Sequence, residues 1–319
     1  MSEYLLEARE LTKEFPAAGK KTVHAVSGIS LQIRKGETLG LVGESGCGKS
    51  TLGRLLIRTL QPTSGEVLFR GQSVTRMKDS EFKPLRKEMQ LVFQDPYASL
   101  DPRMTVRDLV AEPIETWKLY GSREEVTERV RELLRAVGVP EEFLHRYPHQ
   151  FSGGQRQRIG IARAIAANPS FIVCDEPVSA LDVSVQNQIL NLLKELKETR
   201  DLTYLFISHD LSVVRYLADR VCVMFLGKIC EIGPTEEVYE HPRHPYTRFL
   251  LDAVPVPDPA ARGKQIHLLK GEAPSPADPP SGCRFRTRCP YATERCAEEE
   301  PALQEEDGVR AACHCAGKW

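Results

Sequence analysis

The sequence of 319 residues has no long apolar run and almost no net charge. Its longest apolar stretches, such as residues 221–226 and 159–167, fall far short of the roughly 20 residues that span a bilayer. Residues 1–4 also lack the layout of a signal peptide. We therefore expect a soluble, cytoplasmic protein whose membrane role, if any, comes through a partner. A net charge of −1 gives no general electrostatic reason to bind nucleic acid.

Short apolar segments alternate with helical patterns along most of the chain. The sequence predicts strands at residues 5–11, 29–33, 38–42, 171–174, 203–207 and 221–225, and helices at residues 50–60, 123–137, 185–199 and 211–217. Because strands that alternate with helices form a largely parallel sheet, we expect an α/β fold. A helical insertion is expected at about residues 96–165. Beyond Gly233 the pattern changes, and residues 255–280 are rich in proline, which is typical of an extended linker.

A glycine-rich segment between an expected strand and an expected helix fits the pattern G-x-x-x-x-G-K-[ST]. It reads Gly43-Glu44-Ser45-Gly46-Cys47-Gly48-Lys49-Ser50, with Thr51 next. Such glycines let successive N–H groups point at phosphate oxygens, and a helix N-terminus adds its positive dipole. We expect the whole segment and Thr51 to bind a nucleotide, Lys49 to reach its β- and γ-phosphates, and Ser50 to ligate Mg²⁺. The flanking elements disfavour a plain glycine turn with an accidental lysine.

Two adjacent carboxylates, Asp175 and Glu176, end the expected strand 171–174. Because side chains alternate along a strand, the two acids are directed to different tasks. We expect Asp175 to hold Mg²⁺, and Glu176 to polarise an attacking water near the γ-phosphate. The alternative is a pair of solvated acids, which the upstream phosphate loop argues against.

Residues 151–158 read Phe-Ser-Gly-Gly-Gln-Arg-Gln-Arg and open a helix with a serine cap and two glycines. A capped helix N-terminus with glycines suits close approach of an anion. This run resembles the signature motif of ABC-transporter ATPases. The resemblance covers about residues 4–233 and implies a P-loop NTPase core of the ABC type, in which two chains sandwich two ATP molecules. It also implies that four residues close on the γ-phosphate held by the other chain, namely Ser152, Gly153, Gly154 and Gln155.

Further positions resemble the same family in the expected order. Gln94 resembles the Q-loop residue that senses Mg²⁺ and the attacking water, and is therefore implied as a Mg²⁺ ligand as well. Residues 179–182 resemble the D-loop, which crosses the dimer interface, and His209 resembles the switch histidine that contacts the γ-phosphate. Phe15 is the best candidate for stacking on adenine, and His24 is the alternative.

Four segments resemble one branch of that family, the F-type ATPase subunit of dipeptide and oligopeptide importers. They are residues 43–48, 94–102, 175–186 and 241–247, the last of which reads H-P-R-H-P-Y-T. The resemblance implies an ABC ATP-binding domain at residues 1–233 and a C-terminal extension at residues 234–319. It implies an ATPase motor that powers peptide uptake at the cytoplasmic face of the membrane.

The implied partners are a second ATPase subunit of the D type in a heterodimer, two transmembrane permease subunits and, indirectly, an extracytoplasmic peptide-binding protein. A nickel or glutathione importer of the same group stays open, because the solute is chosen by proteins other than this chain. A soluble ABC ATPase that works on DNA or ribosomes would usually carry a long coiled-coil insertion or two tandem cassettes, and neither occurs in this sequence.

Five of the nine cysteines crowd near the end of the chain. A reducing cytoplasm argues against disulfides there, which leaves metal or cluster binding as the sharper hypothesis. Four thiolates suffice for a tetrahedral Zn²⁺ or a [4Fe–4S] cluster. The arrangement resembles the cluster-bearing tail of peptide-importer ATPases, which implies a [4Fe–4S] cluster, with zinc second and free thiols third. The implied ligands are Cys283, Cys289, Cys296 and Cys313, with Cys315 as the alternative for the fourth position.

Overall fold

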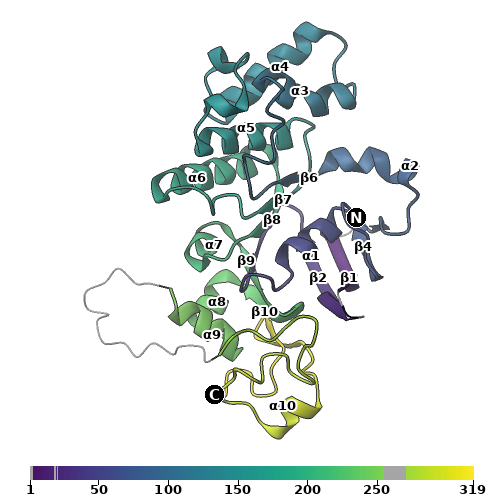
Figure 1. The fold of residues 1–319 in the computed structure, drawn as a ribbon, viewed down its shortest axis with the longest axis vertical. Coiled ribbons are helices and arrows are strands. Elements are labelled where there is room, and N and C mark those ends of the chain that lie inside the picture. The colour runs from purple at the N-terminus through teal and green to yellow at the C-terminus, as the bar shows by residue number, and fades with distance from the viewer. Residues whose placement is uncertain (1–2, 18, 20, 255–270) are drawn as a thin grey trace. The chain divides into compact units, whose positions relative to one another are not determined.

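The computed structural model describes residues 3–17, 19, 21–254 and 271–319 (Figure 1). The chain forms two compact units, one of Met1–Arg76 with Ser208–Trp319 and the other of Met77–Ile207. The predicted phosphate loop and the C-terminal extension belong to the first unit, whereas the carboxylate strand belongs to the second. Most of the expected linker, residues 255–270, lies outside the described residues.

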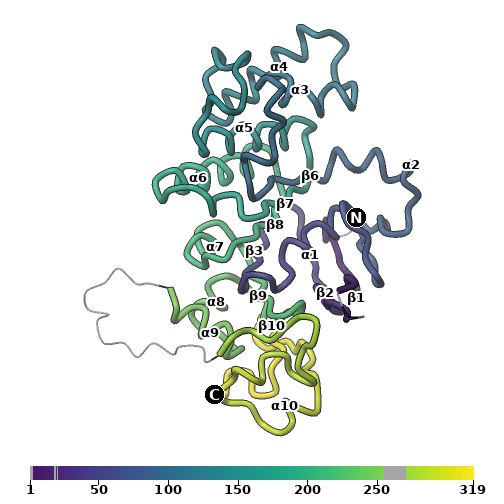
Figure 2. The backbone as a smooth tube through the Cα atoms, in the orientation of Figure 1, coloured from purple at the N-terminus to yellow at the C-terminus, as the bar shows by residue number. Residues whose placement is uncertain are grey.

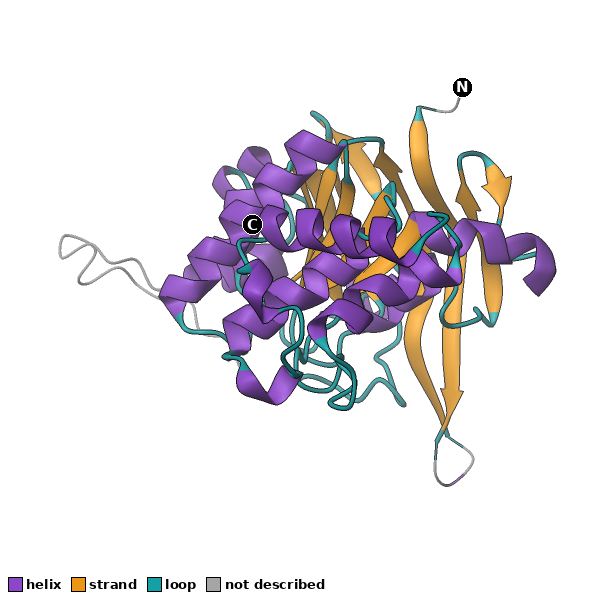
Figure 3. Cartoon of the chain, turned by 90° about the horizontal axis from the view of Figure 1, so that it is seen from above, coloured by secondary structure: helices purple, strands orange, loops and turns teal. Residues whose placement is uncertain are grey.

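The first unit contains an antiparallel sheet in the order β2-β1-β4-β5. Its strands are β1 (Tyr4–Pro16), β2 (Thr22–Arg34), β4 (Ser64–Phe69) and β5 (Gln72–Ser73). Figure 3 shows β1 and β2 as a long two-stranded ribbon, paired as far as Pro16 opposite Thr22. Both strands run well beyond the predicted segments 5–11 and 29–33. The extra pairs are held by the backbone ladder, so the apolar pattern of the side chains does not reveal them.

A second group of strands in this unit begins with β3 (Thr38–Val42), which is buried at every position. β9 (Arg220–Phe225) pairs with β3 in parallel, and β10 (Lys228–Pro234) pairs with β9 antiparallel. The C-terminal segment returns to this sheet, where β12 (Val309–Ala311) pairs with β10 and β11 (Gln304–Glu306) pairs with β12 (Figure 2). The helices of the unit are α1 (Lys49–Leu56), α7 (Leu211–Leu217), α8 (Thr235–Glu240), α9 (Pro245–Asp252) and α10 (Glu294–Glu298).

Helix α1 ends four residues before the predicted boundary at residue 60. Arg58, just past its end, has a φ of 54°, which is left-handed backbone. A left-handed residue cannot continue a helix. Glycine or asparagine at position 58 would have indicated the helix end in the sequence, but arginine does not.

The second unit holds three parallel strands, β6 (Met89–Val92), β7 (Phe171–Asp175) and β8 (Thr203–Ile207). β7 and β8 are buried at every position, as near-continuous apolar runs in parallel sheets are. The helices are α2 (Asp79–Phe82), α3 (Val106–Thr116), α4 (Arg123–Ala136), α5 (Gly153–Ile165) and α6 (Val183–Arg200), with 3₁₀ turns at Lys83–Glu88, Glu141–Phe143 and Pro148–Gln150. Helices α3, α4 and α5 contact one another and lie within the expected helical insertion.

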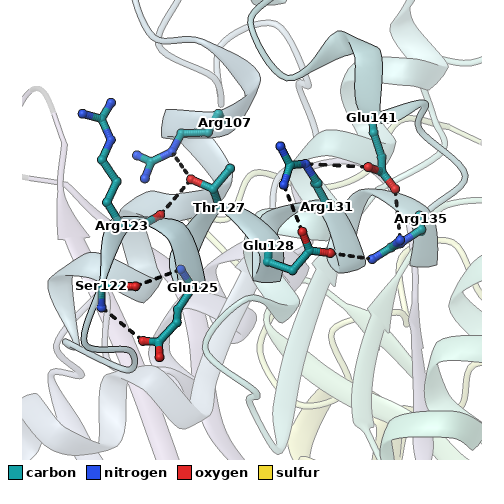
Figure 4. A network of polar contacts seen from close by, with 9 residues as sticks. All are labelled: Arg107, Ser122, Arg123, Glu125, Thr127, Glu128, Arg131, Arg135 and Glu141. Carbon is teal, nitrogen blue, oxygen red and sulfur yellow. Dashed lines mark hydrogen bonds and ion pairs between the residues drawn. The ribbon is translucent and has the colours of Figure 1, made fainter.

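Helix α4 begins with a capping box and carries a row of ion pairs (Figure 4). Ser122 Oγ accepts from the N–H of Glu125 at 3.1 Å, and Glu125 Oε2 accepts from the N–H of Ser122 at 3.1 Å. Farther along, Glu128 bridges Arg131 at 2.9 Å and Arg135 at 3.1 Å. Exposed pairs of this kind contribute little to stability, so the helix is held mainly by its buried apolar face and its cap.

Candidate functional site

The loop between β3 and α1 can be built only with glycine at two of its positions. Gly43 and Gly48 have φ values of 150° and 105°. A Cβ at Gly43 would lie 2.2 Å from the carbonyl oxygen of Met224, and one at Gly48 would lie 2.1 Å from that of Ala25. Because both obstacles are backbone atoms, a side chain at either position would force the loop open.

Lys49 closes this loop on itself. Its side chain is 5% exposed, and Nζ donates to the carbonyl oxygens of Gly43 at 2.7 Å and Glu44 at 3.0 Å. Helix α1 starts here with Gly48 as a left-handed N-cap and no side-chain cap. A positive side chain therefore lies at the mouth of a glycine loop, beside a helix N-terminus that is not capped by a side chain. This is the arrangement that binds phosphate.

The turn between β9 and β10 is hydrogen-bonded to the loop at residues 43–50. The N–H of Gly227 donates to the carbonyl oxygen of Cys47 at 2.9 Å, and the N–H of Ser27 donates to the carbonyl oxygen of Gly227 at 2.9 Å. Cys47 is buried, and burial raises the pKa of its thiol. The cysteine in this loop is therefore a packing residue rather than a nucleophile.

His209 lies in the same unit as the loop. The N–H of Ser208 donates to the carbonyl oxygen of Leu41 at 3.2 Å, so the chain passes beside the end of β3, two residues before Gly43. Asp210 then caps α7 by accepting from the N–H of Ser212 at 2.8 Å. The exposed His209 thus stands between two fixed neighbours, near the start of the phosphate loop.

The second unit brings Gln94 and Glu176 together. Gln94 Nε2 donates to Glu176 Oε2 at 3.1 Å, while Asp175 ends β7 with only 3% exposure. Glu176 has a φ of 45°, an unusual conformation for a glutamate, and its N–H donates to the carbonyl oxygen of Ile207 at 3.0 Å. A strained, doubly anchored acid at a strand end fits a residue held in place for chemistry.

Residues 152–155 form a capping box on α5. Ser152 Oγ accepts from the N–H of Gln155 at 3.3 Å, and Gln155 Oε1 accepts from the N–H of Ser152 at 3.1 Å. A Cβ at Gly154 would lie 2.4 Å from Val185 Cγ1, so this glycine lets α5 pack closely against α6. The segment is therefore both a helix cap and a packing contact.

The predicted D-loop is hydrogen-bonded to the strand end that carries Glu176. Ser179 Oγ donates to the carbonyl oxygen of Glu176 at 3.1 Å, and Asp182 caps α6 by accepting from the N–H of Val185 at 3.0 Å. Gln186 Nε2 donates to the carbonyl oxygens of Val178 and Leu181, both at 3.0 Å. Sequence reasoning did not assign these contacts to Gln186, although it lies within the segment 175–186.

Both candidates for the adenine contact lie on the β1–β2 ribbon. Phe15 pairs with Val23, and the next register position places His24 opposite Glu14. His24 Nδ1 lies 3.0 Å from Glu14 Oε1, whereas the Phe15 ring is half-buried under the ammonium of Lys13 at 5.0 Å. Both side chains thus have a neighbour, and the choice of Phe15 for stacking on adenine stays a prediction.

The expected iron–sulfur cluster is wrong. The described ranges contain no three His, Cys, Asp or Glu side chains grouped so that they could hold a metal ion, and this also leaves the zinc alternative without a site. The five tail cysteines do converge on one small cavity of about 20 Å³, and all are free. Burial raises the pKa of Cys289 to about 11 and that of Cys313 to about 12. Crowding of cysteines in the sequence therefore does not amount to a metal site in the described residues.

Sequence reasoning also missed residues of the C-terminal extension that contact the phosphate loop. The hydroxyl oxygen of Tyr246 accepts from the N–H of Glu44 at 2.9 Å, and Arg288 forms an ion pair with the Glu44 carboxylate at 2.9 Å. Tyr246 belongs to the segment 241–247, whose sequence resembles one branch of the family. No local sequence pattern indicates a contact with a residue about 200 positions away.

No helix in the described part of the chain is long and apolar enough to cross a membrane.

Comparisons with known proteins agree with the motifs. The ABC transporter family matches residues 26–179, and the family described as the C-terminal region of oligopeptide/dipeptide transporters matches residues 230–296. The putative oligopeptide transport ATP-binding protein YkfD of Bacillus subtilis is 55% identical over 312 residues, covering 97% of this chain and 95% of the relative. The oligopeptide transport ATP-binding protein OppF of Escherichia coli is 53% identical over 285 residues, covering 89% and 85%.

The fold is shared with solved cassettes. The dimeric, post-hydrolysis structure of the ATP-binding cassette MJ0796 bound to ADP and Pi has a TM-score of 0.66 and 32% identity, covering 72% of this chain and 98% of the other. CbiO1 of Clostridium perfringens, part of the ABC transporter complex CbiONQ, has a TM-score of 0.66 and 29% identity, covering 75% and 92%. The predicted α/β fold of the P-loop type is confirmed. The chain belongs to the ABC-transporter ATPases, among the oligopeptide transport ATP-binding proteins.

Proposed function

We propose that this chain binds and hydrolyses MgATP as the motor subunit of an importer that takes up dipeptides or oligopeptides. The observation that carries the proposal is the loop at residues 43–50, where two glycines admit no Cβ and Lys49 crosses the loop mouth. That cradle fits the β- and γ-phosphates of a nucleotide. Membership of the oligopeptide branch supports the choice of peptide as the solute.

The residues available for Mg²⁺ fit that ion. The hydroxyl of Ser50, the buried carboxylate of Asp175 and the side-chain amide of Gln94 would hold it, and all three offer the hard oxygen ligands that Mg²⁺ prefers. When bound, Mg²⁺ neutralises charge on the β- and γ-phosphate oxygens.

Hydrolysis then depends on three side chains. Glu176 orients and polarises the attacking water, and the amide of Gln94, 3.1 Å away, fixes the direction of that carboxylate. His209 contacts the γ-phosphate and stabilises charge that develops there. Phe15 stacks on the adenine, with His24 as the second candidate.

A second ATPase subunit completes the ATP-binding sites. Ser152, Gly153, Gly154 and Gln155 present the N-terminus of α5 to the γ-phosphate held by the partner, and residues 179–182 lie at the dimer interface. The partner is a D-type subunit in a heterodimer. The two chains close around ATP and reopen after hydrolysis, and this conformational change drives transport.

The conformational change is transmitted to two transmembrane permease subunits, so the chain works at the cytoplasmic face of the membrane. Residues 94–102 border the surface that receives the permease. Two large aromatic side chains are exposed in this region, Phe93 at 43% and Tyr97 at 63%, and the guanidinium of Arg156 lies 3.8 Å from the Tyr97 ring centroid. Exposed aromatic residues backed by arginine are typical of protein interfaces. An extracytoplasmic peptide-binding protein delivers the solute indirectly.

The proposal is tested by reconstituting the complete transporter with its binding protein in proteoliposomes. ATP-dependent accumulation of a labelled oligopeptide, abolished in the Lys49→Ala complex, is the expected result. Accumulation of nickel or glutathione, with no uptake of peptides of two to several residues, would contradict the peptide assignment while leaving the motor intact.

A further inference from the structure

We infer that Arg288 and Tyr246 are positioning residues for the phosphate-binding loop, so that the C-terminal extension sets the affinity of this chain for ATP. The inference rests on the proposed role of residues 43–50 and adds a control element to that role. Both residues lie in the same compact unit as the loop.

The first contact neutralises an acid inside the loop. Arg288 Nη1 donates to both carboxylate oxygens of Glu44 at 2.9 Å, across 244 residues of sequence. The Arg288 side chain is 8% exposed and that of Glu44 is 28% exposed, so solvent screens the pair only in part. A pair shielded in this way is coupled more strongly than a surface salt bridge.

The second contact holds the backbone of the same residue. The hydroxyl oxygen of Tyr246 accepts from the N–H of Glu44 at 2.9 Å, and Tyr246 is fully buried. Its ring packs against Phe225 at 4.8 Å and Phe285 at 5.3 Å between centroids. Phe225 ends β9, and Phe285 comes from the tail, so the tyrosine is fixed from both sides.

The tail is itself anchored beside the loop. The guanidinium of Arg284 donates to the carbonyl oxygen of Leu226 and, at 3.0 Å, to Ser27 Oγ. The N–H of His24 donates to the carbonyl oxygen of Pro276 at 3.0 Å, and that of Ala312 donates to the carbonyl oxygen of Cys230 at 2.8 Å. Arg288 therefore reaches Glu44 from a docked segment and not from a free arm.

Electrostatics explains why the loop needs this partner. Glu44 is the second residue of a loop that must receive the negative charges of a nucleotide, and an unpaired carboxylate there repels them. Arg288 supplies the neutralising charge, and Tyr246 keeps the neighbouring backbone at the geometry that presents the loop to phosphate. Loss of either contact weakens ATP binding without removing any group that touches the phosphates.

The test measures binding of a fluorescent ATP analogue, with Mg²⁺, to the full-length protein and its variants. Arg288→Met is expected to raise the dissociation constant roughly tenfold, because it leaves the Glu44 carboxylate unpaired in the loop. Tyr246→Phe is expected to raise it by a smaller factor. Arg286→Met is the matched control: Arg286 lies two residues from Arg288 in the same tail but bonds to Ser281, so this variant should bind like the wild type.

Rescue separates positioning from folding. The double variant Arg288→Met with Glu44→Gln should regain most of the wild-type affinity, because the repelling charge is gone. A role of Arg288 in tail folding alone would not be relieved by a change at Glu44. Wild-type affinity in Arg288→Met, or a double variant as weak as Arg288→Met, would overturn the inference. Unchanged binding in Lys49→Ala would instead overturn the proposed function of the loop, so the two failures are distinguishable.

Discussion

Two glycines of helix α5 should respond in opposite ways to the same substitution. A Cβ at Gly154 would lie 2.4 Å from Val185 Cγ1, whereas a Cβ at Gly160 meets nothing within 4 Å. Val185 is β-branched and stiff, so α5 and α6 must separate to admit the extra methyl group. Overpacking of this kind costs about 1–3 kcal/mol, while alanine in place of an unobstructed helical glycine stabilises by up to about 1 kcal/mol.

Urea unfolding followed by circular dichroism measures both changes. We expect Gly154→Ala to lower the free energy of unfolding and Gly160→Ala to raise it. Adding Val185→Ala to Gly154→Ala should recover most of the loss, because it removes the obstructing γ-carbons. Equal stability of Gly154→Ala and the wild type, or no recovery in the double variant, would refute the packing argument.

Two further predictions concern catalysis and pH. Gln94→Ala should lower the ATP hydrolysis rate of the assembled transporter roughly tenfold or more, because Glu176 loses the donor at 3.1 Å that orients it. The control is Gln90→Ala, because the Gln90 side chain donates to the carbonyl oxygen of Arg86 instead. Equal rates in the two variants would contradict the orienting role of Gln94. Burial lowers the pKa of His244 to about 3, so the folded state binds fewer protons than the unfolded state and stability falls as the pH drops from about 6.5 towards 3. His244→Asn keeps an acceptor for the N–H of Tyr246. Between pH 6.5 and 5, this variant should lose roughly 2 kcal/mol less unfolding free energy than the wild type. An unchanged dependence of stability on pH would contradict a neutral, buried His244.

The sequence was informative where chemistry is local. The glycine loop between β3 and α1 could be predicted because its glycines and Lys49 lie within eight consecutive residues, and phosphate binding by these residues stays a prediction. Glu176 was named from its place at a strand end and Gln94 through resemblance to a family, and the structure brings their side chains together at 3.1 Å. The strands β3, β7 and β8 were predicted nearly to the residue, because fully buried strands read as short, unbroken apolar runs.

What the sequence did not reveal depends on distant contacts. Glu44 is held by residues about 200 and 244 positions away, and nothing near Arg288 indicates its partner. The tail cysteines show the opposite error. Their crowding correctly indicated proximity, but ligation also depends on how the side chains are grouped in space, which spacing does not encode. Helix α1 ends early, at Leu56, because Arg58 has left-handed backbone, and an arginine in the sequence does not indicate that conformation.

The central claim is that residues 43–50 bind ATP and that Glu176 drives its cleavage. The most direct measurement is a single-turnover experiment on the assembled transporter, in which bound nucleotide and released phosphate are followed in the same sample. The account predicts that Lys49→Ala loses nucleotide binding, and that Glu176→Gln binds MgATP like the wild type but releases phosphate at least roughly a hundredfold more slowly. Phosphate release at the wild-type rate by Glu176→Gln would contradict it.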